Sequence, residues 1–171
     1  MATANTFVQI GSTVTVGSGG AASFTFTSIP ATYTDLIIKV SARDNRAFTF
    51  DNMAPSFNGS TSNITTNAIY GYAGAVTAAS GSGANYQYSN GNSGTANIFS
   101  NYEWYIPNYA GSNYKSVSSD SVTEDNSSNS IVSLAYNLWS ITTAINEITF
   151  TPVNGSLLQY TTASLYGILK Y

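Results

Sequence analysis

The chain has 171 residues, of which only 8% are charged, and it contains no cysteine and no histidine. Its length suits one domain over residues 1–171, while a net charge of −3 and five cations argue against a nucleic-acid partner, because phosphate neutralisation needs many Lys and Arg side chains. The missing residue types exclude a thiol nucleophile and a Ser-His-Asp triad.

The first segment, Met1–Val14, has no basic residue before its apolar positions, so it does not resemble a secretory signal. Apolar runs such as Leu36–Ile38 are far shorter than the ~20 residues of a membrane-spanning helix. We therefore expect synthesis in a cytoplasm and no membrane partner.

Alternation with a period of two recurs along the chain and predicts strands, whereas helical periodicity is hard to find. In Asp35–Arg43, the apolar side chains at alternate positions from Leu36 to Ala42 share one face and Lys39 lies on the other, as in a half-buried strand. Six weaker strand candidates are Phe7–Val16, Ala22–Thr27, Ala54–Asn58, Ala68–Ala73, Tyr114–Thr123 and Ser156–Leu169.

Three more strands are predicted in the second half of the chain. Around Ile98–Pro107, Tyr102 and Trp104 fall on one face and Tyr105 on the other, so we expect one face to be core and the other a contact surface. In Val132–Trp139, the residues at even positions from Val132 to Leu138 share a face, and Ile148 and Phe150 alternate with Glu147 and Thr149.

About eight to ten short strands separated by turn residues predict an all-β fold, an antiparallel and jelly-roll-like β-sandwich. Gly17–Gly20 is not followed by a lysine and lies between strand-like segments, so it predicts a hairpin turn and not a phosphate-binding loop. Turns are also indicated by the pairs Asn58-Gly59, Asn90-Gly91 and Asn154-Gly155.

The uncharged stretch Gly71–Asn97 is rich in Gly, Ala, Ser and Asn and predicts one long loop. Two interpretations are open. The stretch is either a floppy surface excursion or an arm that orders on a neighbouring subunit, to which Tyr86 and Tyr88 would contribute contact area.

The residues available for chemistry are few, and we expect no enzyme, no cofactor and no metal site. Glu103 and Glu147 could form a glycosidase pair, but both are predicted on the strand face opposite the core, where a solvated carboxylate is the default. Asp120, Glu124 and Asp125 could hold calcium through their oxygens, but their spacing lacks the helix-loop-helix pattern and favours a polar turn.

Tyrosine and tryptophan are the remaining functional asset, because their rings dominate protein interfaces and can also carry a sugar ring. We predict a protein interface, with sugar stacking on Tyr86, Tyr88, Tyr109 and Trp104 as the alternative. Arg43 and Arg46 could form ion pairs across the interface or belong to a solvated turn. The predicted interface residues are Tyr86, Tyr88, Tyr102, Trp104, Tyr105, Tyr109, Tyr114, Arg43 and Arg46.

Three segments resemble a recurrent family of virion structural proteins of tailed phages, especially those of marine bacteria and cyanobacteria: SIPATYTDLIIKVSAR (Ser28–Arg43), WSITTAINEITF (Trp139–Phe150) and TTASLYGI (Thr161–Ile168). The resemblance implies a non-enzymatic virion component made in the cytoplasm of the bacterial host. The expected function is a decoration or cement protein on the outer head shell. Its expected partners are the major capsid protein or other virion proteins and copies of itself, as a homotrimer. A tail- or fibre-associated receptor- or carbohydrate-binding module is the alternative.

Overall fold

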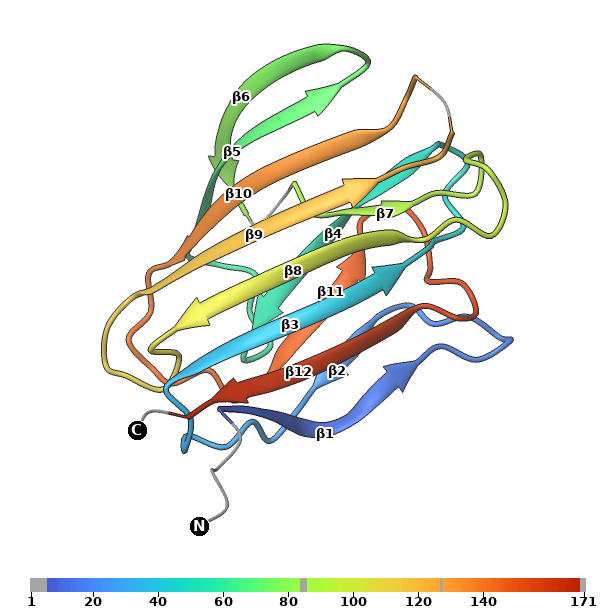
Figure 1. The fold of residues 1–171 in the computed structure, drawn as a ribbon. Coiled ribbons are helices and arrows are strands. Elements are labelled where there is room, and N and C mark those ends of the chain that lie inside the picture. The colour runs from blue at the N-terminus through green and yellow to red at the C-terminus, as the bar shows by residue number, and fades with distance from the viewer. Residues whose placement is uncertain (1–5, 84–85, 127, 170–171) are drawn as a thin grey trace.

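Two antiparallel sheets lie face to face in the computed structural model, which describes residues 6–83, 86–126 and 128–169 (Figure 1). The large sheet has the strand order β1-β12-β3-β8-β9-β10-β5-β6, and the small sheet has the order β2-β11-β4-β7. The described residues contain no helix. The strands are β1 (Phe7–Thr15), β2 (Phe24–Phe26), β3 (Asp35–Ala42), β4 (Phe50–Phe57), β5 (Ile64–Tyr72), β6 (Ala75–Ser82), β7 (Tyr88–Asn90), β8 (Ser100–Pro107), β9 (Lys115–Thr123), β10 (Ile131–Trp139), β11 (Ile148–Pro152) and β12 (Thr162–Ile168).

The predicted all-β sandwich is confirmed, and its main core lies between the small sheet and strands β12, β3 and β8. Leu36 and Ile38 of β3 are fully buried, as the alternation predicts. On β8, Trp104 packs edge-on against Phe150 of β11, with ring centroids 5.1 Å apart. Burying one such side chain contributes about 1.5–3 kcal/mol, so this half of the sandwich holds the two sheets together.

The predicted long loop at Gly71–Asn97 is wrong, because strands β6 and β7 and the end of β5 lie within this stretch. Ala73 and Gly74 both have positive φ, 49° and 80°, and Tyr72 pairs with Ala75. A two-residue turn with positive φ at both positions matches the twist of a β-hairpin. The chain therefore folds back and adds β6 to the edge of the large sheet.

The turn predicted at Gly17–Gly20 is present, but it does not close a hairpin. It joins β1 in the large sheet to β2 in the small sheet, and the Gly20 N–H donates to the Gly17 carbonyl at 3.0 Å. Gly20 has a φ of +70°, and a Cβ there would lie 2.8 Å from the Leu157 carbonyl oxygen. Glycine is thus required because the chain crosses between the sheets against the backbone of Leu157.

Candidate functional site

Beyond β8, the side of the large sheet that faces the interior becomes polar. The buried positions of β9 and β10 include Ser119, Ser121 and Ser133. They pack against the segment leading into β7, where Gln87 Nε2 donates to Ser119 Oγ at 2.7 Å and Ser133 Oγ donates to the Tyr86 carbonyl at 2.5 Å. Small side chains with hydroxyl groups let this segment approach closely and satisfy part of its polar groups.

The opposite side of the same strands is apolar and exposed. Leu134 of β10 is 63% exposed and Ile69 of β5 is 58% exposed, although both are large apolar residues. The register places them directly opposite each other and puts Ala78 of β6 next to Ile69. We name this surface the apolar outer face; its residues are Ile69, Val76, Ala78, Val122, Val132, Leu134 and Tyr136.

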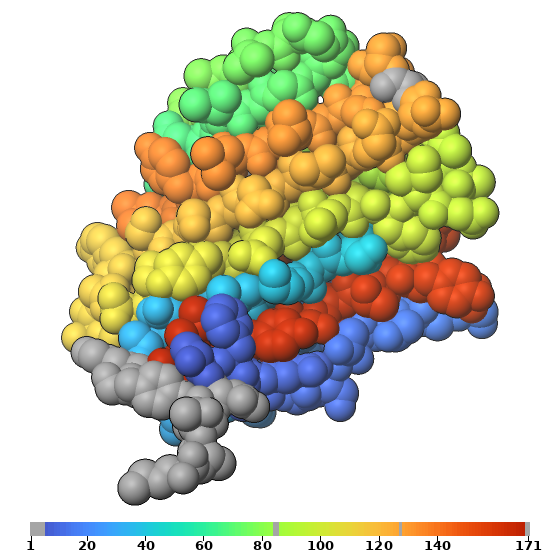
Figure 2. All heavy atoms as spheres, viewed as in Figure 1, coloured from blue at the N-terminus to red at the C-terminus, as the bar shows by residue number. Residues whose placement is uncertain are grey.

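Figure 2 views the molecule from this side, and β9, β10, β5 and β6 form neighbouring bands in its upper half. A shallow hollow of about 420 Å³ lies among them, lined by Ile69, Ala78, Leu134 and Tyr136 together with neighbouring residues. β6 forms the edge of the sheet and is exposed along nearly its whole length. Its backbone groups on the open side are available to another strand.

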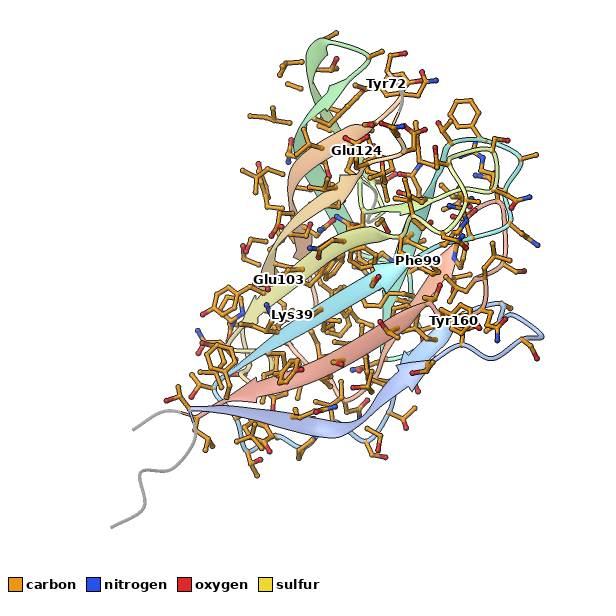
Figure 3. The ribbon with its side chains drawn as sticks, turned by 45° about the vertical axis from the view of Figure 1, so that its right-hand side comes forward. Lys39, Tyr72, Phe99, Glu103, Glu124 and Tyr160 are labelled. Atoms are coloured by element: carbon orange, nitrogen blue, oxygen red, sulfur yellow. The ribbon has the colours of Figure 1, made fainter. Side chains whose placement is uncertain are left out.

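An exposed carboxylate adjoins the apolar outer face. Asp120 of β9 lies opposite Leu134, and burial raises the pKa of its carboxyl group above the usual value. One strand further on, Lys39 Nζ lies 2.5 Å from Glu103 Oε2 in an exposed ion pair (Figure 3). No lysine or arginine belongs to the apolar outer face, so its contacts with a partner would depend on apolar burial.

Four of the nine predicted interface residues have rings that are at most 4% exposed: Tyr88, Tyr102, Trp104 and Tyr109. The expectation that they supply accessible contact area is therefore corrected. Tyr102 and Trp104 face the small sheet, and the Tyr109 hydroxyl donates to the Pro30 carbonyl. The same burial leaves Tyr88, Tyr109 and Trp104 unable to carry a sugar ring.

Three of the predicted tyrosines lie nearer the surface. Tyr114 is 56% exposed. Tyr86 is half-buried and stacks on Tyr70 with 5.6 Å between the ring centroids. The hydroxyl of Tyr105 donates to Asp35 Oδ2 at 2.8 Å, and this bond raises the pKa of Tyr105. Tyr114 is the member of this group whose ring is most open to a partner.

The two predicted arginines serve the fold. Arg43 is only 6% exposed, and its guanidinium donates to the carbonyls of Gly94, Thr95 and Ile98 at 2.7–3.0 Å. Arg46 Nη1 lies 3.2 Å from Oδ1 of the buried Asp51. Both arginines hold loops in place, so neither is free to form the predicted ion pair across an interface.

A buried acid lies beside these arginines. Asp44 is fully buried, and burial raises the pKa of its carboxyl group to about 6. The Ser89 hydroxyl and the Arg46 backbone N–H both donate to the Asp44 carboxyl group, which lowers the pKa in part. Within residues 6–83, 86–126 and 128–169, no cluster of three or more acidic, histidine or cysteine side chains is placed to hold a metal ion.

The fold defines the chain as an antiparallel β-sandwich, and no helix in the described part of the chain is long and apolar enough to cross a membrane. No family model, curated protein or solved structure matches this chain. The site is therefore defined by its geometry.

The predicted interface residues do not include the apolar outer face. A signal for it exists in the sequence: in Val132–Trp139, the even positions are apolar while Ser133, Ala135 and Asn137 occupy odd positions. The odd positions also include Trp139, a large residue that is usually buried. The pattern alone therefore does not tell which of the two faces is the buried one. The pattern identifies two different faces, and the structure shows that the apolar one is outside.

Proposed function

We propose that the chain is a non-enzymatic structural protein that self-associates through the apolar outer face and, as an oligomer, decorates and stabilises the outer head shell of a tailed phage. The observation that carries self-association is the exposure of Ile69, Val132, Leu134 and Tyr136, each between 54% and 63%, side by side on one sheet face. An exposed apolar patch of this kind marks a protein interaction site.

The occupant we propose for this face is a second copy of the chain. Strands spaced about 4.8 Å apart with about 3.4 Å per residue give the four strands roughly 500 Å² of flat area. A standard interface buries about 800 Å² per partner, so the face and its polar rim together approach that size. The residues that define the face are uncharged, and the nearest carboxylate is that of Asp120, opposite Leu134. Strand β6 has neither a charge nor a proline.

Three copies is the oligomer size that we expect. The assignment to a virion, and contact with a major capsid protein, are supported by the resemblance of Ser28–Arg43, Trp139–Phe150 and Thr161–Ile168 to virion structural proteins. The low charge and the scarcity of groups for acid-base chemistry support a non-enzymatic role.

The self-association is tested by light scattering coupled to size exclusion, with the wild type compared with Leu134→Lys. We expect an oligomer for the wild type and a monomer for Leu134→Lys, because the substitution puts a charge in the centre of the apolar outer face. Thr151→Lys is the matched control, since Thr151 is exposed on the outer side of the small sheet. A wild-type chain that stays monomeric at its highest soluble concentration contradicts the proposal.

The location is tested by the number of copies of this chain per purified phage particle, measured by quantitative mass spectrometry. Hundreds of copies are expected for a protein that covers the head shell. A handful or a few dozen copies would place it in the tail or at a vertex and would refute the decoration role, while leaving self-association to be decided by the experiment above.

A further inference from the structure

A second candidate site lies at the end of the sandwich where four connections meet: β1–β2, β3–β4, β7–β8 and β11–β12. They line an open hollow of about 480 Å³, within the range of about 300–1,000 Å³ that ligand pockets occupy. Figure 3 turns this end forward and labels two of the lining residues, Phe99 and Tyr160. None of the residues of the apolar outer face lines the hollow, so it is a separate site.

Tyr160 is held at the hollow in an unfavourable backbone conformation. Its φ is +72°, and its side chain is 67% exposed. A non-glycine residue in this region costs about 1–3 kcal/mol and persists only where its surroundings impose it. Here the Tyr160 N–H donates to the Val16 carbonyl at 3.0 Å, and the Thr161 N–H donates to the Leu158 carbonyl at 3.2 Å.

Arg43 joins the two walls of the hollow. Its guanidinium holds the β7–β8 connection through the carbonyls of Gly94, Thr95 and Ile98. Its backbone holds the β11–β12 connection, because the Leu158 N–H and the Thr161 hydroxyl both donate to the Arg43 carbonyl, at 2.8 and 3.1 Å. Both walls are therefore fixed before any ligand arrives, which lowers the entropic cost of binding.

Free amide groups surround the hollow. The side chains of Asn92, Asn97 and Gln159 are exposed, line it, and make no hydrogen bond to any residue within the described ranges. A primary amide offers two donors and one acceptor oxygen, so each can bind a pair of hydroxyl groups that donate and accept. The polar lining suits a neutral ligand with many hydroxyl groups.

A second hollow lies beside Phe99, among residues of β12, β3 and β8. This depression of about 350 Å³ shares Phe99 and is lined by Ser41, Asn101 and Thr162, with Lys39 among its other lining residues. The ring of Phe99 thus lies between two hollows. We call these two adjoining hollows the groove.

We propose that this groove binds a neutral oligosaccharide. Sugar rings would stack on Tyr160 and Phe99, and the amides of Asn92, Asn97 and Gln159 would bind their hydroxyl groups. The charged side chains lining it are already engaged: the guanidinium of Arg43 by three carbonyls and Lys39 by Glu103. The groove therefore favours an uncharged chain over a uronate or a phosphate.

The test is a titration of the purified protein with maltohexaose, cellohexaose and chitohexaose as neutral probes and with hexagalacturonate as the charged probe. We expect binding of at least one neutral probe and weaker binding of hexagalacturonate. Tyr160→Gly removes the stacking ring while suiting the positive φ, so the variant should fold at least as stably as the wild type and bind about tenfold more weakly.

Tyr114→Ala is the matched control, because Tyr114 is also exposed but does not line the groove, and its affinity should equal that of the wild type. Three results would each overturn the proposal: no binding of any neutral probe, binding of hexagalacturonate alone, or unchanged affinity in Tyr160→Gly. This experiment measures sugar binding and not self-association. A negative result would therefore refute the sugar-binding proposal without bearing on the proposed oligomer.

Discussion

The two halves of the large sheet have opposite polarity. Strands β12, β3 and β8 turn large apolar side chains such as Trp104 inward and place Lys39 and Glu103 outside. Strands β9, β10 and β5 turn residues such as Ser133 inward and expose Leu134. Alternation within a strand therefore does not tell which side is core, because the layer that covers the strand decides that. The first half holds the main core, and the second half exposes the apolar outer face that we propose for self-association.

The largest effect is expected when Trp104 is replaced by Ala. Trp104 is fully buried and packs against Phe57 and Phe150, so truncation should lower the free energy of unfolding by about 3–5 kcal/mol. Leu134→Ala, in the other half, should change it by less than about 0.5 kcal/mol at a concentration where the chain is monomeric, as is usual for a surface substitution. Urea denaturation of both variants checks this. Equal losses would show that the halves do not differ in this way.

The second prediction reverses the polarity at a single inward position of β10. In Ser133→Leu, the larger side chain meets the Tyr86 carbonyl, which lies 2.5 Å from Ser133 Oγ, and loses this bond. We expect a loss of about 2 kcal/mol in the free energy of unfolding, from overpacking and the lost hydrogen bond. Ser118→Leu is the control on the outer side of β9 and should be nearly neutral. A stabilised Ser133→Leu variant would show that the inward face accepts apolar residues.

The third prediction concerns Asp44, which lies just after β3 in the half of the large sheet that contains the main core. Since its pKa of about 6 in the folded chain exceeds the value of about 3.9 for an unfolded chain, the folded state binds the proton first. Stability from this group is therefore present below about pH 4 and is lost as the pH rises through 6. Asp44→Asn should remove this loss. Between pH 4 and pH 7, the free energy of unfolding of the wild type should fall by about 2 kcal/mol relative to that of the variant, which denaturation at both pH values measures. An identical pH dependence in both proteins would contradict it.

The smallest effect is expected at the boundary between the halves, where Lys39 pairs with Glu103. The pair is exposed, and the hydrogen bond that Lys39 donates to Glu103 raises the pKa of Lys39. Exposed ion pairs contribute about 0.2–1 kcal/mol, so Lys39→Met should cost no more than that, and the difference should shrink in high salt. Thermal melts at low and high salt measure it. A larger cost that does not depend on salt would indicate that the lysine stem packs on the sheet.

Several strands could be predicted closely from period-two alternation, including one of the weaker candidates, Tyr114–Thr123. Asp35–Arg43 and Tyr114–Thr123 agree with β3 and β9 to within one residue at each end. The hairpin of β5 and β6 was missed because Ala73, at its turn, is not a residue that signals positive φ. The hollow at Tyr160 was missed as well, since its walls come from connections that are far apart in the sequence and meet at Arg43.

Residue types and their spacing alone predict an all-β chain, exclude histidine and cysteine chemistry, and show that strands such as those at Ile98–Pro107 and Val132–Trp139 have two unlike faces. These are local properties of residue type and of period-two spacing. The tertiary structure decided which face of each strand is covered and brought Phe99, Tyr160 and Arg43 to one end of the sandwich. Burial depends on which distant segment packs on a strand. The segment that contains Gln87 packs on the small polar side chains of β9 and β10, so the apolar side of β10 is left outside.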